Sequence, residues 1–176
     1  MKLYVARHGQ TQWNKENKVC GLTDQALTDE GLSQAQALAL SLSDKKIDLI
    51  ISSPLKRALQ TAQAVSQMYG IPIITDNRLI EQNYGIYEGA HRQNEAFLSN
   101  KRMFAYKYPG GESMMQVAHR AYSLIDEVKE KYPGKNILFA CHGGVCRVIN
   151  TYFNDVTNDE FFHYSPDNCS VLEYEL

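Results

Sequence analysis

Short apolar runs alternate along this chain with longer segments in which apolar residues recur at helical spacing. This alternation limits the possible folds more than any other feature. Runs of strand length lie at 3–6, 48–53, 71–75 and 136–141, with an alternating apolar and polar run at 170–174. Helical spacing marks 29–42, 54–69, 114–128 and 145–153. Strands separated by helices pair in parallel, so we predict a three-layer α/β/α sandwich with a mostly parallel central sheet.

Capping residues indicate where the predicted helices begin and end. Thr28 precedes two acidic residues and is a typical N-cap. Pro54 suits the first position of the next helix, and Gly70 suits its end. The Pro133-Gly134 pair stops the long helix that follows. In residues 78–111 the apolar side chains recur with no clear period, so this segment is harder to assign to helix or strand.

Length and charge restrict the class of protein. A chain of 176 residues fits a single domain, 1–176, with a sizeable core. The formal net charge of -2 gives no general attraction to nucleic acid or to an anionic membrane. No apolar stretch approaches the roughly 20 residues that span a bilayer. Four scattered cysteines and a start without a secretory pattern favour a reducing, cytoplasmic location.

Two predicted strands end in a histidine followed by glycine, at His8 and at His142. The predicted strand 48–53 leads into a helix that carries Arg57. Ligands of parallel sheets bind at the carboxyl ends of the strands, so we expect these three side chains near one edge of the sheet. The alternatives are plain: His8 caps a strand, and Arg57 is an exposed arginine, the commonest location of that residue.

Two further features leave alternatives open. Cys141 and Cys146 flank His142, so a His/Cys metal site is one interpretation, although zinc sites usually use paired cysteines and more ligands. Buried reduced cysteine is the simpler reading. Glu81 and Glu88 are both candidates for an acid/base group, and their positions alone do not decide between them.

Six motifs in order resemble the histidine phosphatase superfamily, the phosphoglycerate-mutase-like proteins. They cover nearly the whole chain and read RHGQTQWN at 7–14, GLTDQALTDEGLSQA at 21–35, SSPLKRALQTA at 52–62, LIEQNYGIYEG at 79–89, PGGES at 109–113 and CHGGVCRV at 141–148. The resemblance implies a phosphoglycerate-mutase-like fold. It also implies metal-independent hydrolysis of phosphomonoesters through a phosphohistidine, with no cofactor.

The resemblance assigns roles by position. It implies that His8 is the nucleophile, that Arg7 and Arg57 bind the phosphoryl oxygens, and that His142 donates to the phosphoryl group. Asn14 would be a neutral donor beside them. Such an arrangement suits phosphoryl transfer, which depends on positioning and electrostatic stabilisation.

The same resemblance matches Glu81 to the family's proton donor, and Glu88 to an element that supports the loop. It further implies substrate or phosphate contacts from four residues, Cys20, Gly21, Tyr84 and Gly143. Gln10 and Cys146 depart from the common pattern without touching a catalytic position. Arg92 falls roughly where the mutases place a substrate-binding lysine.

Two alternatives to a phosphatase remain. Bisphosphoglycerate-dependent mutases carry a longer insertion with extra basic residues, whereas only 90–108 fills that gap here. A mutase must also keep water from the phosphohistidine, and a short cover favours hydrolysis. The other alternative is a catalytically silent binding protein on the same fold, against which the complete set of catalytic residues argues.

The expected partner is a small phosphorylated metabolite, and the sequence leaves a homodimer open. Sugar phosphates, phosphoglycerates, a phosphoserine-like amino acid and ribazole phosphate are all candidates. Six residues are candidates for lining the leaving-group side or for forming a packed aromatic cover: Asn83, Tyr84, Met103, Phe104, Tyr106 and Tyr108.

Overall fold

The computed structural model describes all 176 residues and is built around a five-stranded sheet. The strands are β1 (Lys2–Arg7), β2 (Leu49–Ser52), β3 (Ile73–Thr75), β4 (Ile137–Cys141) and β5 (Val171–Glu175). Their order in the sheet is β3-β2-β4-β1-β5. The first four strands are parallel to their neighbours, and β5 runs antiparallel to β1 at the edge. The prediction of a mostly parallel sheet is confirmed.

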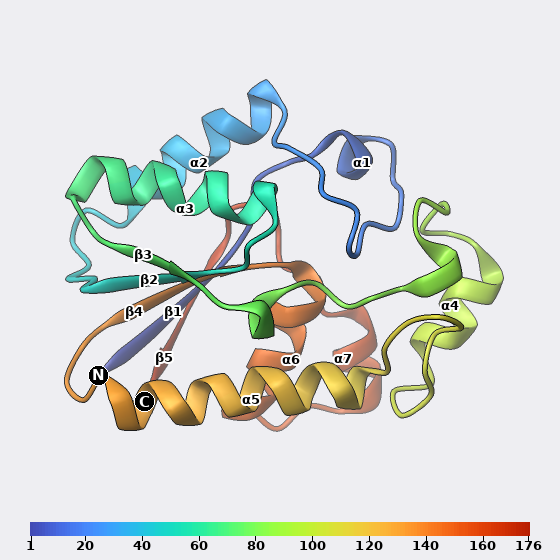
Figure 1. Ribbon diagram of the computed structural model, residues 1–176. Helices are drawn as coiled ribbons and strands as arrows, with labels where there is room; N and C mark the ends of the chain where they lie inside the picture. The colour runs from blue at the N-terminus through green and yellow to red at the C-terminus, as the bar shows by residue number, and fades with distance from the viewer.

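Helices cover both faces of this sheet (Figure 1). They are α1 (Gln12–Lys15), α2 (Asp29–Ser41), α3 (Lys56–Tyr69), α4 (Glu95–Lys101), α5 (Met114–Lys131), α6 (Gly143–Phe153) and α7 (Asn158–His163). Two single 3-10 turns, η1 (Asn77–Leu79) and η2 (Gly85–Tyr87), follow β3. Helices α2 and α3 lie on one face, and α5 and α6 lie on the other.

The buried strands explain why their sequences are continuously apolar. In β1, Leu3 and Val5 pack into the core under α5 and α6, whereas Tyr4 and Ala6 pack into the core under α2 and α3. A strand covered on both faces needs apolar residues at successive positions, because their side chains point to opposite faces of the sheet. Strand β5 lies at the edge, and from Leu172 onward its residues alternate between half-buried and exposed, as its sequence predicts.

Helix boundaries follow the predicted caps with one exception. The Thr28 hydroxyl accepts from the Gly31 N–H, and Gly70 ends α3 at φ 67°. The placement of Pro54 at the first helical position is wrong, because α3 begins at Lys56. The extended chain continues past β2, and the Lys56 N–H donates to Asp24 from a distant loop at 2.7 Å. A tertiary contact therefore caps the helix in place of a local one.

Three short helices in regions without a helical prediction, α1, α4 and α7, lie outside the sequence prediction. The segment 82–113, which holds α4, packs on a small core of its own in which Val19, Phe97 and Tyr108 are buried. We call this segment the cover. Two residues expected on buried helix faces are instead exposed, Leu32 by 43% and Met68 by 39%, since each lies at the rim of its apolar stripe.

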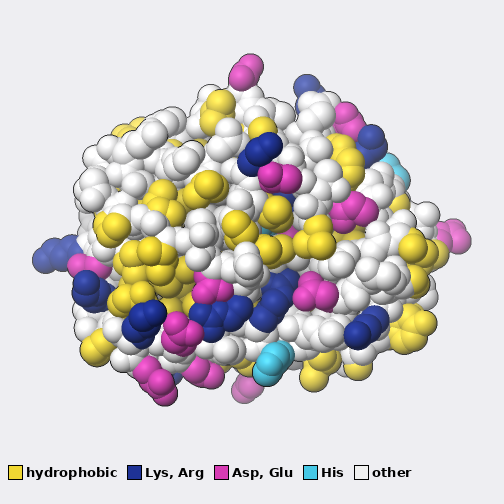
Figure 2. Space-filling model, viewed as in Figure 1, with side chains coloured by type: hydrophobic (Ala, Val, Ile, Leu, Met, Phe, Trp, Pro, Cys, Tyr) yellow, Lys and Arg dark blue, Asp and Glu magenta, His cyan; other side chains and the backbone are white.

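The surface carries charges of both signs. On the face shown in Figure 2, Lys and Arg side chains lie among Asp and Glu side chains and form no broad area of one sign. None of the helices is both long enough and apolar enough to cross a membrane.

Candidate active site

Strands β1 and β4 are neighbours, and their carboxyl ends bring two histidines together. Arg7 pairs with Cys141 in the parallel register, and the backbone N–H of His8 donates to the Cys141 carbonyl at 3.0 Å. His8 and His142 each follow directly, and their ring centroids lie 5.1 Å apart. The expected gathering at the sheet edge is therefore present in the structure.

His8 is buried and held in one orientation. Its Nδ1 lies 2.7 Å from the Gly9 carbonyl oxygen, a position in which Nδ1 carries the hydrogen and Nε2 keeps its lone pair. Burial, followed by the charges of Arg57 and Arg7, holds the pKa of His8 well below its usual value. The imidazole is therefore neutral at neutral pH, the form that a nucleophile requires.

Glycine at position 9 is required by close packing. A Cβ there would lie 2.5 Å from the Gly31 carbonyl oxygen, at the start of α2. The strand end that carries His8 is thereby pressed against α2, and the histidine is fixed by rigid neighbours.

Arg7 lines the site with a donor that has no partner within the protein. One terminal nitrogen donates to the Pro166 carbonyl, while Nε is buried without a hydrogen bond. Burial, then the charge of Arg92, lowers the pKa of Arg7. A buried guanidinium with a free N–H beside His8 favours an anion at this point.

Arg57 and His142 lie behind His8 and do not line the cavity. Arg57 has no exposed surface, so the alternative of an exposed arginine is wrong. Its guanidinium donates to the carbonyls of Gly21 and Thr23 and, at 3.1 Å, to Nδ1 of His142. Two of the five guanidinium hydrogens remain free of these bonds.

His142 is bonded at both ring nitrogens. Because Nδ1 accepts from Arg57, Nε2 carries the hydrogen and donates to the Ser53 hydroxyl at 2.8 Å. Burial and the charge of Arg57 hold the pKa of His142 well below its usual value. This arrangement makes His142 an orienting partner of Arg57. Donation to a phosphoryl group, which the family resemblance implies for His142, stays a prediction.

Asn14 lies in α1 with its amide group oriented by neighbours. Its Oδ1 accepts from the Thr11 N–H, within a capping box, and from Asn168 at 3.4 Å. The amide oxygen is thus occupied and the Nδ2 group is left as the donor. Asn14 lines the cavity, and its role as a neutral donor stays a prediction.

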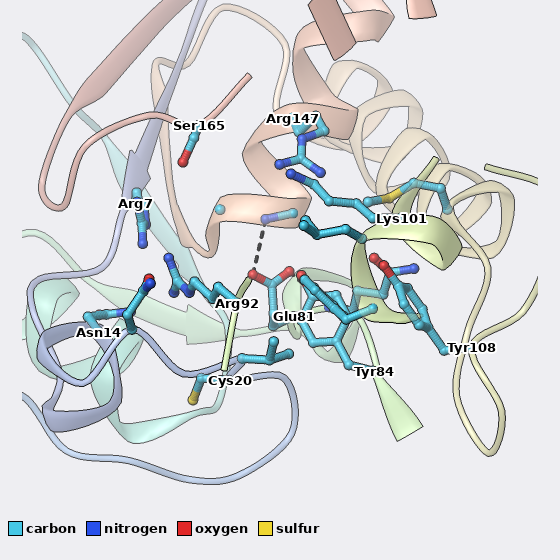
Figure 3. Close-up of a pocket in the computed structure, with 18 of the residues that line it drawn as sticks. Arg7, Asn14, Cys20, Glu81, Tyr84, Arg92, Lys101, Tyr108, Arg147 and Ser165 are labelled. Carbon is cyan, nitrogen blue, oxygen red and sulfur yellow. Dashed lines mark hydrogen bonds between the residues drawn. The ribbon is translucent and has the colours of Figure 1, made fainter. Parts of the chain in front are cut away.

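Glu81 and Glu88 differ in location. Glu81 is buried and lines the cavity, where its carboxylate accepts from the backbone N–H groups of Gln82 at 2.9 Å and Gly144 at 3.0 Å (Figure 3). A Cβ at Gly144 would lie 2.6 Å from that carboxylate, so the glycine makes room for it. Glu88 instead accepts from the N–H groups of Gly21 and Thr23 and fixes their loop.

The remaining predicted contact residues also divide into residues that line the cavity and one that supports a loop. Tyr84, Gly143 and Cys20 line the cavity. Burial raises the pKa of Cys20 to about 11, so it is a neutral thiol. Gly21 does not line the cavity. Its backbone N–H donates to the Glu88 carboxylate, and its carbonyl accepts from Arg57. Gly21 serves close packing, since a Cβ there would lie 2.4 Å from the Gln82 carbonyl oxygen.

The cavity has a volume of about 250 Å³ and extends from His8 under the cover. Its far end contains two cations, Lys101 and Arg147, for which the sequence analysis predicts no role. The one local signal for Arg147 is its position three residues after the His-Gly-Gly motif. Lys101 lies in α4, where the sequence predicts no helix. Of the six predicted leaving-group residues, Tyr84 and Tyr108 line the cavity, while Met103 and Tyr106 are exposed.

The metal alternative has little support from side-chain placement. The sulfurs of Cys141 and Cys146 lie 3.5 Å apart in the core. The structure contains no group of three or more His, Cys, Asp or Glu residues that could hold an ion.

Known proteins match this chain over nearly its whole length. The family model of the histidine phosphatase superfamily (branch 1) matches residues 3–176. Phosphoserine phosphatase 1 of Hydrogenobacter thermophilus is 28% identical over 97% of this chain and 84% of its own length. Phosphoglycerate mutase-like protein 4 of Arabidopsis thaliana is 36% identical over 84% of this chain and 69% of its own.

Solved structures give the same result for the fold. The mycobacterial glucosyl-3-phosphoglycerate phosphatase in complex with VO3 superposes with a TM-score of 0.90 at 27% identity. That match covers 98% of this chain and 91% of the other. The similarity thus includes both phosphatases and a mutase-like protein.

Proposed function

This chain belongs to the histidine phosphatase superfamily (branch 1), and from that premise we propose that it is a phosphatase acting on small phosphomonoesters without a metal ion. The relatives named phosphatases support the general activity. The neutral, oriented imidazole of His8 at the floor of the cavity is the observation that carries the proposal.

The first step transfers phosphorus to nitrogen. The Nε2 lone pair of His8 forms a bond to phosphorus while the bond from phosphorus to the ester oxygen breaks. Glu81 gives its proton to that departing oxygen, and the alcohol leaves. In the second step the water oxygen forms a bond to phosphorus while the bond from phosphorus to Nε2 of His8 breaks, the Glu81 carboxylate takes a proton from the water, and inorganic phosphate departs. Both residues then return to their starting forms.

Fixed positive charge supports this chemistry. Arg7 and Asn14 offer donors at the same end of the cavity as His8. Arg57 lies behind His8 and is anchored to two backbone carbonyls, so its charge stays in place as negative charge builds up on the phosphoryl group. Such groups need no reorganisation during the reaction.

The test is hydrolysis of 4-nitrophenyl phosphate in the presence of a chelator, combined with trapping of the intermediate. We expect turnover with EDTA present and an acid-labile, alkali-stable phosphoryl adduct on His8 after rapid quench. Absence of turnover on this ester and on a panel of phosphorylated metabolites would reject the phosphatase. Phosphoglycerate exchange that depends on bisphosphoglycerate would instead identify a mutase, and binding without turnover would identify a silent protein.

A further inference from the structure

The far end of the cavity brings two cations together. Lys101, at the end of α4, and Arg147, on α6, both line the cavity on the other side of Glu81 from Arg7 and Asn14 (Figure 3). Arg147 is buried, and Lys101 is partly buried. Two different elements of the fold, α4 of the cover and α6 on one face of the sheet, thus supply this pair.

No acidic side chain neutralises the pair. Neither Lys101 nor Arg147 takes part in any ion pair of the structure. Glu81 is the sole carboxylate that lines the cavity, which also contains Arg7 and Arg92. The mixed charges on the surface face of Figure 2 make this excess of cations a local property of the cavity.

The contacts of these two side chains leave most of their N–H donors without a partner in the protein. Arg147 Nε donates to the Tyr164 carbonyl at 2.9 Å, and no other guanidinium nitrogen is bonded. The Lys101 ammonium lies 4.4 Å from the centroid of the Phe162 ring and makes no hydrogen bond to the protein. Burial, then repulsion from Arg147, lowers the pKa of Lys101 to about 8.

Tyr108 adds an independent sign of a ligand. It lines the same cavity and is 3% exposed, with its ring stacked against Phe97. Its hydroxyl is buried without any hydrogen-bond partner. A buried O–H without an acceptor is costly, and an anion held beside it would supply one.

We propose that Lys101, Arg147 and Tyr108 form a second anion-binding subsite, which selects phosphomonoesters whose leaving group carries a carboxylate or a second phosphate. The subsite rests on the proposed function, since it holds the alcohol end of the ester while His8 receives the phosphoryl group. Guanidinium and ammonium groups recognise either anion, so the shared feature is a second negative charge at a fixed distance from the first.

Matched substrates separate this subsite from phosphate binding. Glycerol 3-phosphate and 3-phosphoglycerate differ only by a hydroxymethyl group in place of a carboxylate, and glycerol 1,3-bisphosphate adds a second phosphate. We expect kcat/KM to be at least about tenfold higher for one of the two doubly anionic esters, the size of one charge-assisted hydrogen bond. The preferred ester identifies which anion the subsite takes.

The variant Lys101→Met keeps the side-chain length and removes the charge. We expect it to reduce the preference for the doubly anionic ester over glycerol 3-phosphate by about tenfold, through KM. Lys101→Arg should restore much of the preference. Arg102→Met is the control, since Arg102 is the adjacent cation and does not line this cavity.

Two results would overturn the subsite. One is an unchanged preference in Lys101→Met; the other is an equal loss in Lys101→Met and Arg102→Met. Calorimetric binding of 3-phosphoglycerate and glycerol 1,3-bisphosphate to His8→Ala, with and without Lys101→Met, tests the subsite without turnover. If no ester is hydrolysed but Lys101→Met weakens that binding about tenfold, the phosphatase fails and the subsite stands. If Lys101→Met leaves that binding unchanged, the subsite fails.

Discussion

The two ends of the cavity are built in different ways. At the His8 end, His8 and His142 directly follow strands β1 and β4, and Glu81 is held by the backbone N–H of Gly144, which follows β4. At the Lys101 end, the cover supplies α4 and an aromatic cluster packed against loops. The His8 end is fixed by the sheet, whereas the Lys101 end depends on how the cover packs.

Because the two ends are built differently, we expect the His8 end to determine activity and the Lys101 end to determine specificity. Side chains at strand ends are positioned by many buried bonds and suit chemistry that tolerates little movement. Loops and short helices over a scaffold tolerate change and suit recognition of variable groups. We therefore expect changes at the His8 end to abolish turnover on every ester, and changes at the Lys101 end to alter only the choice of ester.

The largest effect is expected for His8→Ala. Removing the nucleophile should lower kcat on all esters by roughly ten-thousandfold or more. The side chain bonds only to its own neighbour Gly9, so thermal unfolding should shift by no more than a few degrees. Steady-state kinetics and calorimetry check both expectations. Substantial remaining turnover in the folded variant would contradict the nucleophile assignment.

Glu81→Gln should come next and should separate esters by leaving group. Loss of general-acid assistance costs typically about a hundredfold to ten-thousandfold on alkyl phosphates. Aryl phosphates, which leave without much protonation, should lose far less. Parallel kcat/KM measurements on glycerol 3-phosphate and 4-nitrophenyl phosphate decide the matter, and equal losses on both would argue against a proton donor.

Gly144→Ala should have an intermediate effect through the same carboxylate. Its Cβ would lie 2.6 Å from Glu81, which must then move. We expect alkyl phosphate turnover to fall by about tenfold to a hundredfold, as for a displaced catalytic group. The comparator is Gly143→Ala, whose Cβ would meet Arg7 only at 3.6 Å and should cost several-fold less. A larger loss for Gly143→Ala would show that Glu81 is not the sensitive group.

The smallest effect is a pH dependence at the Lys101 end. The pKa of Lys101 is lowered to about 8 by burial and by Arg147, Arg92 and Arg102, so its ammonium loses its proton as pH rises through that value. The KM for the preferred doubly anionic ester should therefore rise a few-fold from pH 7 to 9, relative to glycerol 3-phosphate. Lys101→Arg should remove this rise, because arginine stays charged. A rise that persists in Lys101→Arg would assign the effect elsewhere.

The order of strands along the chain, the parallel sheet and the residues at its carboxyl edge all follow from patterns in the amino-acid sequence. Apolar runs and histidine-glycine strand ends are local patterns, and neighbouring parallel strands place their ends together. Arg7, His8, Asn14 and Glu81 belong to motifs that the sequence shows directly, and all four line the cavity. Their roles in the reaction remain predictions for the experiments above.

Contacts between distant segments of the chain are visible in the folded protein alone. The burial of Arg57, the Asp24 cap of α3 and the meeting of Lys101 with Arg147 each join residues more than thirty positions apart. Such contacts depend on how loops fold over the sheet, and no local period encodes them. The charge balance of the whole chain likewise hides a cavity in which cations outnumber the single carboxylate.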